Sequence, residues 1–185
     1  MATKKYELLK DDTKEYCGRT LYRIKALVAI GLSVAAGDVG GYVEAEKNLS
    51  HEGNAWVSGN ARVYGNARVS GDAELYGNAM VYGNAWVSGN AELSGNARVY
   101  GNARVQKHDD IQTYSGFGSE NGTLTVYRTR DGIELTRGCF RGSLDQFRTA
   151  VKEKHGQSKY GKTYLSIADV IECWFSSEEE QKEAA

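Results

Sequence analysis

Histidine and cysteine are the side chains of this sequence that could carry acid–base, nucleophilic or metal chemistry. The histidines are His51, His108 and His155. His108 precedes Asp109 and Asp110, and a carboxylate neighbour can tune an imidazole for general-base catalysis, although polar loops also bring such residues together by chance. His51 falls where the repeat described below expects an inward apolar residue, so a structural imidazole is the favoured interpretation. His155 ends a predicted helix, where a cation suits the terminal carbonyl groups.

The cysteines follow no metal-binding pattern. They are widely separated in the sequence, whereas zinc sites use closely spaced ligand pairs. We therefore expect reduced thiols in a compartment like the cytosol at Cys17, Cys139 and Cys173. The glycines belong to a regular repeat and predict no phosphate-binding loop, and no Gly-x-Ser-x-Gly motif predicts a hydrolase. From these patterns we expect no cofactor and no metal.

Composition adds little about partners. The chain has 185 residues and a formal net charge of −1, which does not favour a nucleic acid or a membrane surface. The longest apolar stretch, residues 26–36, is shorter than the roughly 20 residues that span a bilayer. We expect a soluble, cytoplasmic protein with one repeat body and a small appendage.

The elements that position the side chains come from a six-residue repeat between Gly53 and Val105. Each unit has the pattern Gly-Asn-Ala-x-Val-Ser/Tyr, and no insertion interrupts it. Ala and Val lie two positions apart and share one face of an extended segment. Gly and Asn tolerate the positive φ of a corner. Short strands joined by such corners wind into a solenoid that is filled by stacked Ala and Val.

The pattern V-x-G-N-A-x resembles the hexapeptide repeat of single-stranded left-handed β-helix proteins, in which three units make one triangular coil. The resemblance spans about 70 residues, from 35 to 106, although Gly sits one place later than in the best-known acyltransferase version. It implies a mainly β fold, with a left-handed parallel β-helix of about four coils. An N-terminal β cap and a small C-terminal α+β module complete the expected architecture.

We expect five segments along the chain. The first alternates like a short antiparallel strand pair, which would cover the open edge of the first coil. Near the other end, Asp131-Gly132 marks a hairpin turn, and Ser143 with Gln146 forms a capping box for a helix that ends near Gly156. The expected segments are a β cap (1–34), the β-helix with a degenerate first coil (35–106), a connector (107–122), an α+β module whose second helix begins near Thr163 (123–177), and an acidic tail (178–185).

Outward residues should form columns, because three units per coil stack residues 18 positions apart. One column carries Trp56, Glu74 and Glu92, and another carries Arg68, Trp86 and Arg104. The remaining column combines tyrosines, arginines and a methionine, which are residue types enriched at protein interfaces. Stacked tyrosines also stabilise a flat sheet by themselves. The predicted partner-binding residues are Arg62, Tyr64, Met80, Tyr82, Arg98 and Tyr100.

The whole layout, including residues 37–44 and 48–54, resembles small bacterial and prophage-borne β-helix proteins. These are often described as hexapeptide acyltransferases, with no demonstrated reaction. The resemblance implies a phage-encoded protein in the cytosol of a bacterial host. We expect a non-catalytic scaffold that binds a bacterial protein, for example an antiphage defence component, and inhibits it by occupying its surface. We also expect a homo-oligomer, either a dimer or a trimer.

Two other functions stay open at this point. Left-handed β-helix acyltransferases imply an acyl-CoA donor and a histidine base, but such enzymes interrupt their coils with a loop that covers the substrate, and residues 53–105 contain no interruption. Single-stranded nucleic acid could stack on aromatic residues beside arginines, although Glu74 and Glu92 weaken the positive field. The arginines in question are Arg62, Arg68, Arg98 and Arg104.

Overall fold

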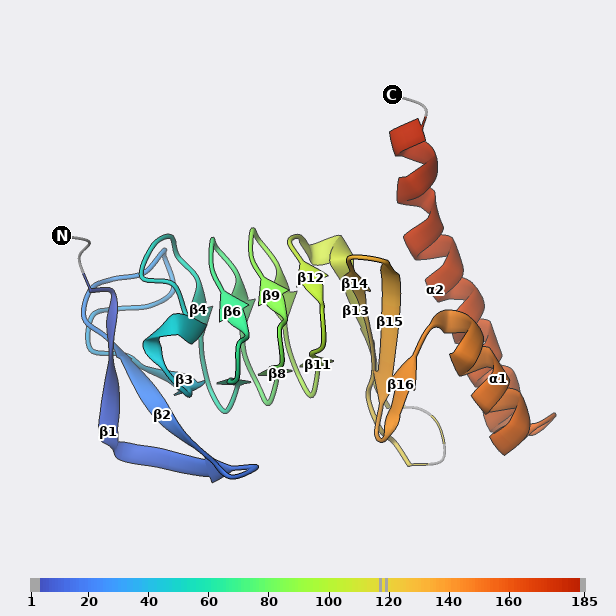
Figure 1. Ribbon diagram of the computed structural model, residues 1–185, viewed down its shortest axis with the longest axis horizontal. Coiled ribbons are helices and arrows are strands. Elements are labelled where there is room, and N and C mark those ends of the chain that lie inside the picture. The colour runs from blue at the N-terminus through green and yellow to red at the C-terminus, as the bar shows by residue number, and fades with distance from the viewer. Residues whose placement is uncertain (1–3, 117, 119, 184–185) are drawn as a thin grey trace. The chain divides into compact units, whose positions relative to one another are not determined.

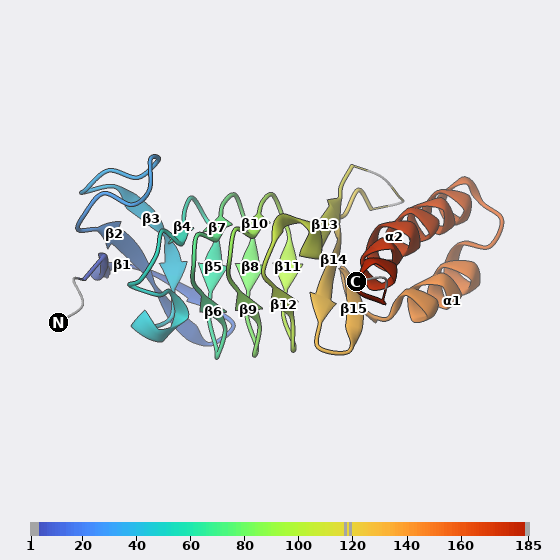
Figure 2. The same cartoon turned by 90° about the horizontal axis from the view of Figure 1, so that it is seen from above.

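The chain folds into two compact units, Met1–Ile111 and Gln112–Ala185, which are described separately below. The computed structural model describes residues 4–116, 118 and 120–183. The first unit holds the six-residue repeat as a stack of coils, which Figure 1 and Figure 2 show as successive rungs. The second unit combines a small antiparallel sheet with two helices.

Each repeat unit contributes one two-residue strand and one corner. Parallel pairing joins strands eighteen residues apart, as in the ladder of Arg62, Met80 and Arg98. The strands are β4 (Trp56–Val57), β5 (Arg62–Val63), β6 (Arg68–Val69), β7 (Glu74–Leu75), β8 (Met80–Val81), β9 (Trp86–Val87), β10 (Glu92–Leu93), β11 (Arg98–Val99) and β12 (Arg104–Val105). They confirm a mainly β fold with a parallel β-solenoid of about four turns. Its left-handed sense stays a prediction.

Alanine and valine side chains of successive coils fill the solenoid interior, and all of them in the repeat are buried. Backbone hydrogen bonds between coils align them, for example from the Trp56 N–H to the Ala73 carbonyl oxygen at 2.9 Å. The corners bring backbones close together. At Gly71, where φ is +67°, an added Cβ atom would lie 2.8 Å from the Gly89 nitrogen. A side chain there would clash, so the stack requires glycine at this corner.

The N-terminal residues form a long hairpin that extends one of the solenoid sheets. The register shifts between Leu9 and Thr13, and Figure 1 shows the hairpin bending sharply part-way along its length. Tyr6 and Ile24, in the half nearer its open end, are fully buried. The hairpin strands β1 (Tyr6–Tyr16) and β2 (Arg19–Ala26) pair antiparallel, and β2 pairs with β3 (Val39–Val43), which joins β5 in parallel.

The first coil is longer than the regular ones. Leu49 bridges Val69, so these residues stack twenty positions apart rather than eighteen. The extra residues lie in the corner that follows η1 (Glu46–Asn48). The expectation that His51 takes an inward, valine-like position is therefore wrong. Leu49 takes that position, and His51 lies in the enlarged corner.

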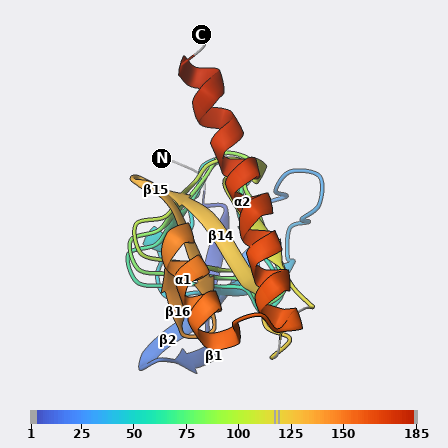
Figure 3. The same cartoon turned by 90° about the vertical axis from the view of Figure 1, so that its right-hand side faces the viewer.

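The second unit is a four-stranded sheet in the order β13-β14-β15-β16, with two helices on one of its faces (Figure 3). The expected hairpin is present with Asp131-Gly132 at its turn, and Ser143 caps the first helix through a capping box with Gln146. The elements are β13 (Ile111–Tyr114), β14 (Leu124–Thr129), β15 (Gly132–Arg137), β16 (Phe140–Gly142), α1 (Leu144–His155) and α2 (Lys159–Glu183).

Helix α2 differs from the expectation at both ends. It begins at Lys159 rather than near Thr163, because the Ser158 hydroxyl accepts a hydrogen bond from the Gly161 N–H at 3.2 Å and caps the earlier start. It continues through Glu183, so residues 178–183 are helical and do not form a separate tail. Glutamate and lysine are good helix formers, which permits this extension. Within the described residues, no helix is long and apolar enough to cross a membrane.

Candidate interaction surface

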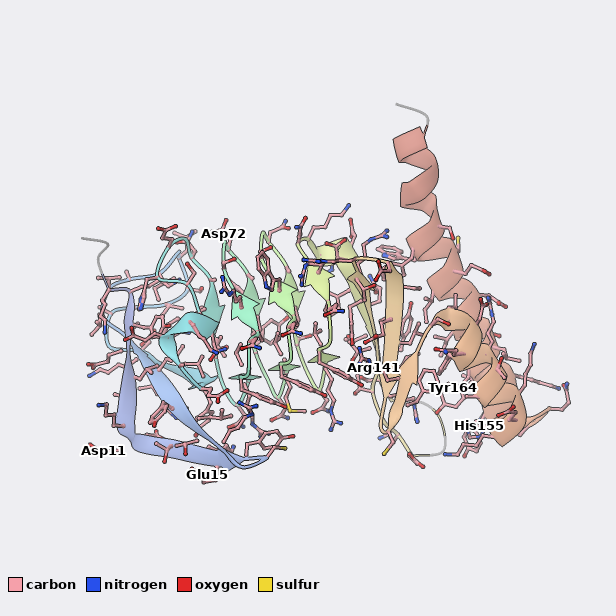
Figure 4. The ribbon with its side chains drawn as sticks, viewed as in Figure 1. Asp11, Glu15, Asp72, Arg141, His155 and Tyr164 are labelled. Atoms are coloured by element: carbon pink, nitrogen blue, oxygen red, sulfur yellow. The ribbon has the colours of Figure 1, made fainter. Side chains whose placement is uncertain are left out.

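The outward columns of the solenoid bring together side chains from different coils, as the sticks in Figure 4 show. The strand register places all three predicted columns as expected. We name the faces by their residues. The acidic face carries Trp56, Glu74 and Glu92, the tyrosine face carries Arg62, Met80 and Arg98 beside Tyr64, Tyr82 and Tyr100, and the arginine–tryptophan face carries Arg68, Trp86 and Arg104.

On the tyrosine face, the three rings form a stacked ladder. Tyr64 and Tyr82 lie parallel with ring centroids 5.0 Å apart, and Tyr82 and Tyr100 follow at 4.6 Å. The spacing matches the distance between coils, about 4.8 Å, because each ring rises from the same position of successive coils. The regular stacking of the coils therefore sets the regular stacking of the rings.

The outer half of the hairpin packs on the beginning of this ladder. Tyr16 meets Tyr64 edge to face with centroids 5.8 Å apart, and the Arg62 guanidinium lies 4.6 Å from the Tyr16 ring centre. Leu21, from β2, joins the same apolar cluster as Tyr64. Burial raises the pKa of Tyr64 above its ordinary range. The hairpin thus docks on the tyrosine face of the solenoid.

The six predicted partner-binding residues are consequently not equivalent. Tyr64 is only 8% exposed and Met80 only 7% exposed. Arg62, Tyr82 and Tyr100 are half-buried, and Arg98 is exposed. The repeat pattern places all six in one column, but it contains no signal for a hairpin that folds back from forty or more residues away. The part of the column beyond the hairpin is the part that a partner can reach.

The acidic face is also covered at its first coil. Trp56 is buried beside Gly40, where an added Cβ atom would lie 2.7 Å from the indole. Residues 30–34 of the loop between β2 and β3 line one cavity with Trp56, and its volume is about 390 Å³. The acidic residue Glu74 lines the same cavity. The first coil of this face is therefore packed against the chain's own N-terminal segment.

On the arginine–tryptophan face, the central aromatic residue is accessible. Trp86 is 48% exposed. Arg68 and Arg104 lie over its ring, with guanidinium carbons 5.6 and 4.9 Å from the ring centre. A groove of about 490 Å³ lies on this face. The sequence places these residues in one column, but it does not predict their exposure, which depends on where the N-terminal segment packs.

His51 belongs to a cluster at the first coil with Lys5 and Tyr6. Its ring stacks on Tyr6 with centroids 4.4 Å apart, and its Nδ1 accepts a hydrogen bond from the Lys5 N–H at 3.2 Å. Burial lowers the pKa of the imidazole below its ordinary value. The Nδ1 lone pair is already used in this hydrogen bond, so the imidazole is held as a structural group and is poorly placed to act as a general base.

The other histidines lie elsewhere. His108 is exposed in η2 (His108–Asp110). His155 ends α1, and its ring centre lies 5.3 Å from that of Tyr164 in the second unit (Figure 4). The three sulfhydryl groups are free and exposed, at Cys17, Cys139 and Cys173.

The coils that carry these faces are similar to a known repeat. The family model of the YdcK beta solenoid repeat matches residues 55–71, 61–74, 73–89 and 97–107. The chain is a β-solenoid repeat protein. The matched residues lie within the solenoid, so this similarity concerns the scaffold that positions the three faces. A comparison with the curated proteins found no match.

Proposed function

We propose that the solenoid is a rigid binding scaffold that recognises another protein through the part of the tyrosine face beyond the hairpin. The observation that carries this proposal is the packing of the chain's own hairpin on the same face. There, Tyr16 contacts Tyr64 and accepts the Arg62 cation over its ring. The same residue types recur further along the ladder, at Tyr82, Arg98 and Tyr100.

The ladder suits binding because it is ordered before a partner arrives. Backbone hydrogen bonds between coils hold Tyr82 in register, from its N–H to the Val99 carbonyl oxygen at 3.1 Å. A preordered surface loses little conformational entropy on association. Tyrosine and arginine are also among the residues that contribute most to binding energy at protein interfaces. A surface of this kind acts by occupying the surface of its partner.

The partner that we propose is a bacterial protein. The resemblance to prophage-borne β-helix proteins supports a phage-encoded factor in the host cytosol that binds and inhibits a host component, such as an antiphage defence protein. A second copy of the chain is the competing occupant, because a two-fold dimer would place the same ladder of each copy against the other.

Affinity capture from bacterial lysate tests the proposal. The double variant Arg98→Ala/Tyr100→Ala should lose the captured protein. Tyr76→Ala removes a tyrosine side chain that lies across a corner from the tyrosine face. This variant should still capture the protein. Circular dichroism and thermal unfolding of each variant establish that the solenoid remains folded. Capture that survives the double substitution contradicts the proposal, and size exclusion with light scattering identifies self-association.

An acyltransferase function predicts different experimental results. An acyltransferase would bind acetyl-CoA with measurable heat in a calorimeter and would lose turnover on His51→Ala or His108→Ala. Turnover of an acyl-CoA by the intact chain, together with its loss in one of these variants, would replace the binding function proposed here.

A further inference from the structure

The groove on the arginine–tryptophan face presents cationic and hydroxyl side chains together. We call it the arginine–tryptophan groove. Its volume of about 490 Å³ lies within the range of protein ligand sites. Polar or aromatic side chains from three successive coils line it, including Lys47, Ser50, Arg68, Ser70, Trp86 and Ser88.

Trp86 stands between two guanidinium groups. Its parallel-strand partners are Arg68 on the preceding coil and Arg104 on the following coil. Both guanidinium groups lie over the ring, with their carbons 5.6 and 4.9 Å from its centre, and the indole as a whole stays 48% exposed. The aromatic contact also orders the planar fork of Arg68 before any ligand arrives.

The groove is positively charged. Within the described part of the chain, no carboxylate pairs with Arg68. The acidic side chain in the lining is Glu46, and the Lys4 ammonium neutralises it at 2.6 Å. On the acidic face, the corresponding column carries Glu74 instead of a cation. The ligand that complements the groove is therefore an anion.

The geometry favours carboxylate over phosphate and nucleic acid. Helix N-termini and backbone nests bind phosphate through unpaired N–H groups, but the N–H groups of Arg68, Ser70 and Trp86 donate to carbonyl oxygens of the next coil at 2.9 to 3.0 Å, so they offer no such site. Single-stranded nucleic acids stack their bases on an accessible aromatic face, whereas the Arg68 and Arg104 guanidinium groups already lie over the Trp86 ring. A carboxylate needs only side-chain donors, which an arginine fork supplies.

We infer that the arginine–tryptophan groove binds an acidic segment of a polypeptide. An aspartate or glutamate carboxylate of that segment pairs with Arg68, and Lys47 adds a second cation. The serine hydroxyl groups bind the peptide backbone, because each hydroxyl both donates and accepts hydrogen bonds. This surface is separate from the tyrosine face, so the inference does not depend on the function proposed above.

Fluorescence anisotropy with a labelled glutamate-rich peptide tests the inference on the full-length chain. The peptide should bind at low ionic strength and weaken as salt is added. Arg68→Glu should weaken binding by about tenfold or more, because a charge-assisted hydrogen bond becomes a repulsion. Arg130→Glu makes the same charge change at an exposed turn of the second unit and should alter binding by less than about twofold.

Three results would overturn the inference. The first is no binding of the peptide at low salt, and the second is an equal loss in Arg68→Glu and Arg130→Glu, which would indicate nonspecific attraction. The third is tighter binding of oligothymidylate or inorganic phosphate than of the peptide. Arg68→Gln, which keeps a polar side chain without its charge, serves if Arg68→Glu fails to fold. It should weaken peptide binding in the same direction.

Discussion

The Lys5 ammonium lies 2.8 Å from the carbonyl oxygen of Ala55, at the edge of the sheet formed by β4, β7 and β10. Among the described residues no preceding strand pairs with β4 in this sheet, and Lys5 also donates to the Gly53 carbonyl oxygen at 3.2 Å. Asn48 performs the same task at the neighbouring sheet edge, where its amide donates to the Ala67 carbonyl oxygen at 2.8 Å. Side chains thus satisfy the backbone groups that would otherwise invite edge-to-edge pairing.

Lys5→Met should lower the free energy of unfolding by about 1–3 kcal/mol, because it leaves buried carbonyl groups without a donor. Urea unfolding at pH 7 measures this change. The Lys5 pKa falls to about 8 in the folded state from an ordinary value of 10.5. The unfolded state therefore binds the proton more tightly between these values, and stability should rise with pH above about 8. Lys5→Met should remove that rise, and an unchanged pH slope would contradict the assigned burial.

His51 should make the free energy of unfolding depend on pH below neutrality. Its pKa is lowered in the folded state by burial. The folded state therefore takes up a proton less readily, and stability should fall as the pH drops below the ordinary histidine value of 6.5. His51→Gln should flatten the difference in unfolding free energy between pH 7 and pH 5. Carboxylates contribute equally to both proteins, so parallel slopes would show that His51 is not responsible.

The glycine corners should differ in their tolerance of alanine. Gly71→Ala introduces a Cβ atom 2.8 Å from the Gly89 nitrogen, whereas Gly95→Ala, at a φ of +59°, meets no atom within 4 Å. Gly95→Ala should cost about 1–2 kcal/mol from the positive φ alone. Gly71→Ala should cost about 1–3 kcal/mol more, because two coils must separate. Thermal or urea unfolding compares the two, and equal losses would show that conformational strain dominates at both corners.

Tyr16→Ala should loosen the outer half of the hairpin. The substitution removes the edge-to-face contact with Tyr64 and the aromatic partner of Arg62, which together contribute about 1–2 kcal/mol. Hydrogen exchange should accelerate in residues 13–22 while the coils stay protected. Lys10→Ala, at an exposed position of β1, is the control and should leave exchange unchanged. Faster exchange throughout the solenoid would show that the hairpin stabilises the whole stack.

Local patterns predict an element well where its conformation depends mainly on residues that are neighbours in the sequence. Gly, Ala and Val at fixed spacing predict the repeated strands and corners, and the resemblance to β-helix proteins implies three such units per coil. The helix that Ser143 caps follows from its capping box with Gln146. The position of His51 could not be predicted in the same way, because the extra residues in the first corner shift the phase without leaving a break in composition. Strands β13 and β16 were also missed, since short strands with mixed polarity carry little periodic signal.

The sequence by itself determined a solenoid, because a strict six-residue period of Gly, Ala and Val repeats one strand and one corner. Its columns followed from the three units per coil that the resemblance to left-handed β-helix proteins implies. With three units per coil, the repeat places Tyr64, Tyr82 and Tyr100 in one column whatever the remaining chain does. Only the tertiary structure decided which parts of each column are accessible. Tyr64 is buried where the hairpin packs on it, Trp56 is buried beside β3 and the loop that precedes it, and Trp86 is exposed. Such contacts join residues far apart in the sequence, and no local periodicity predicts that one segment packs on another.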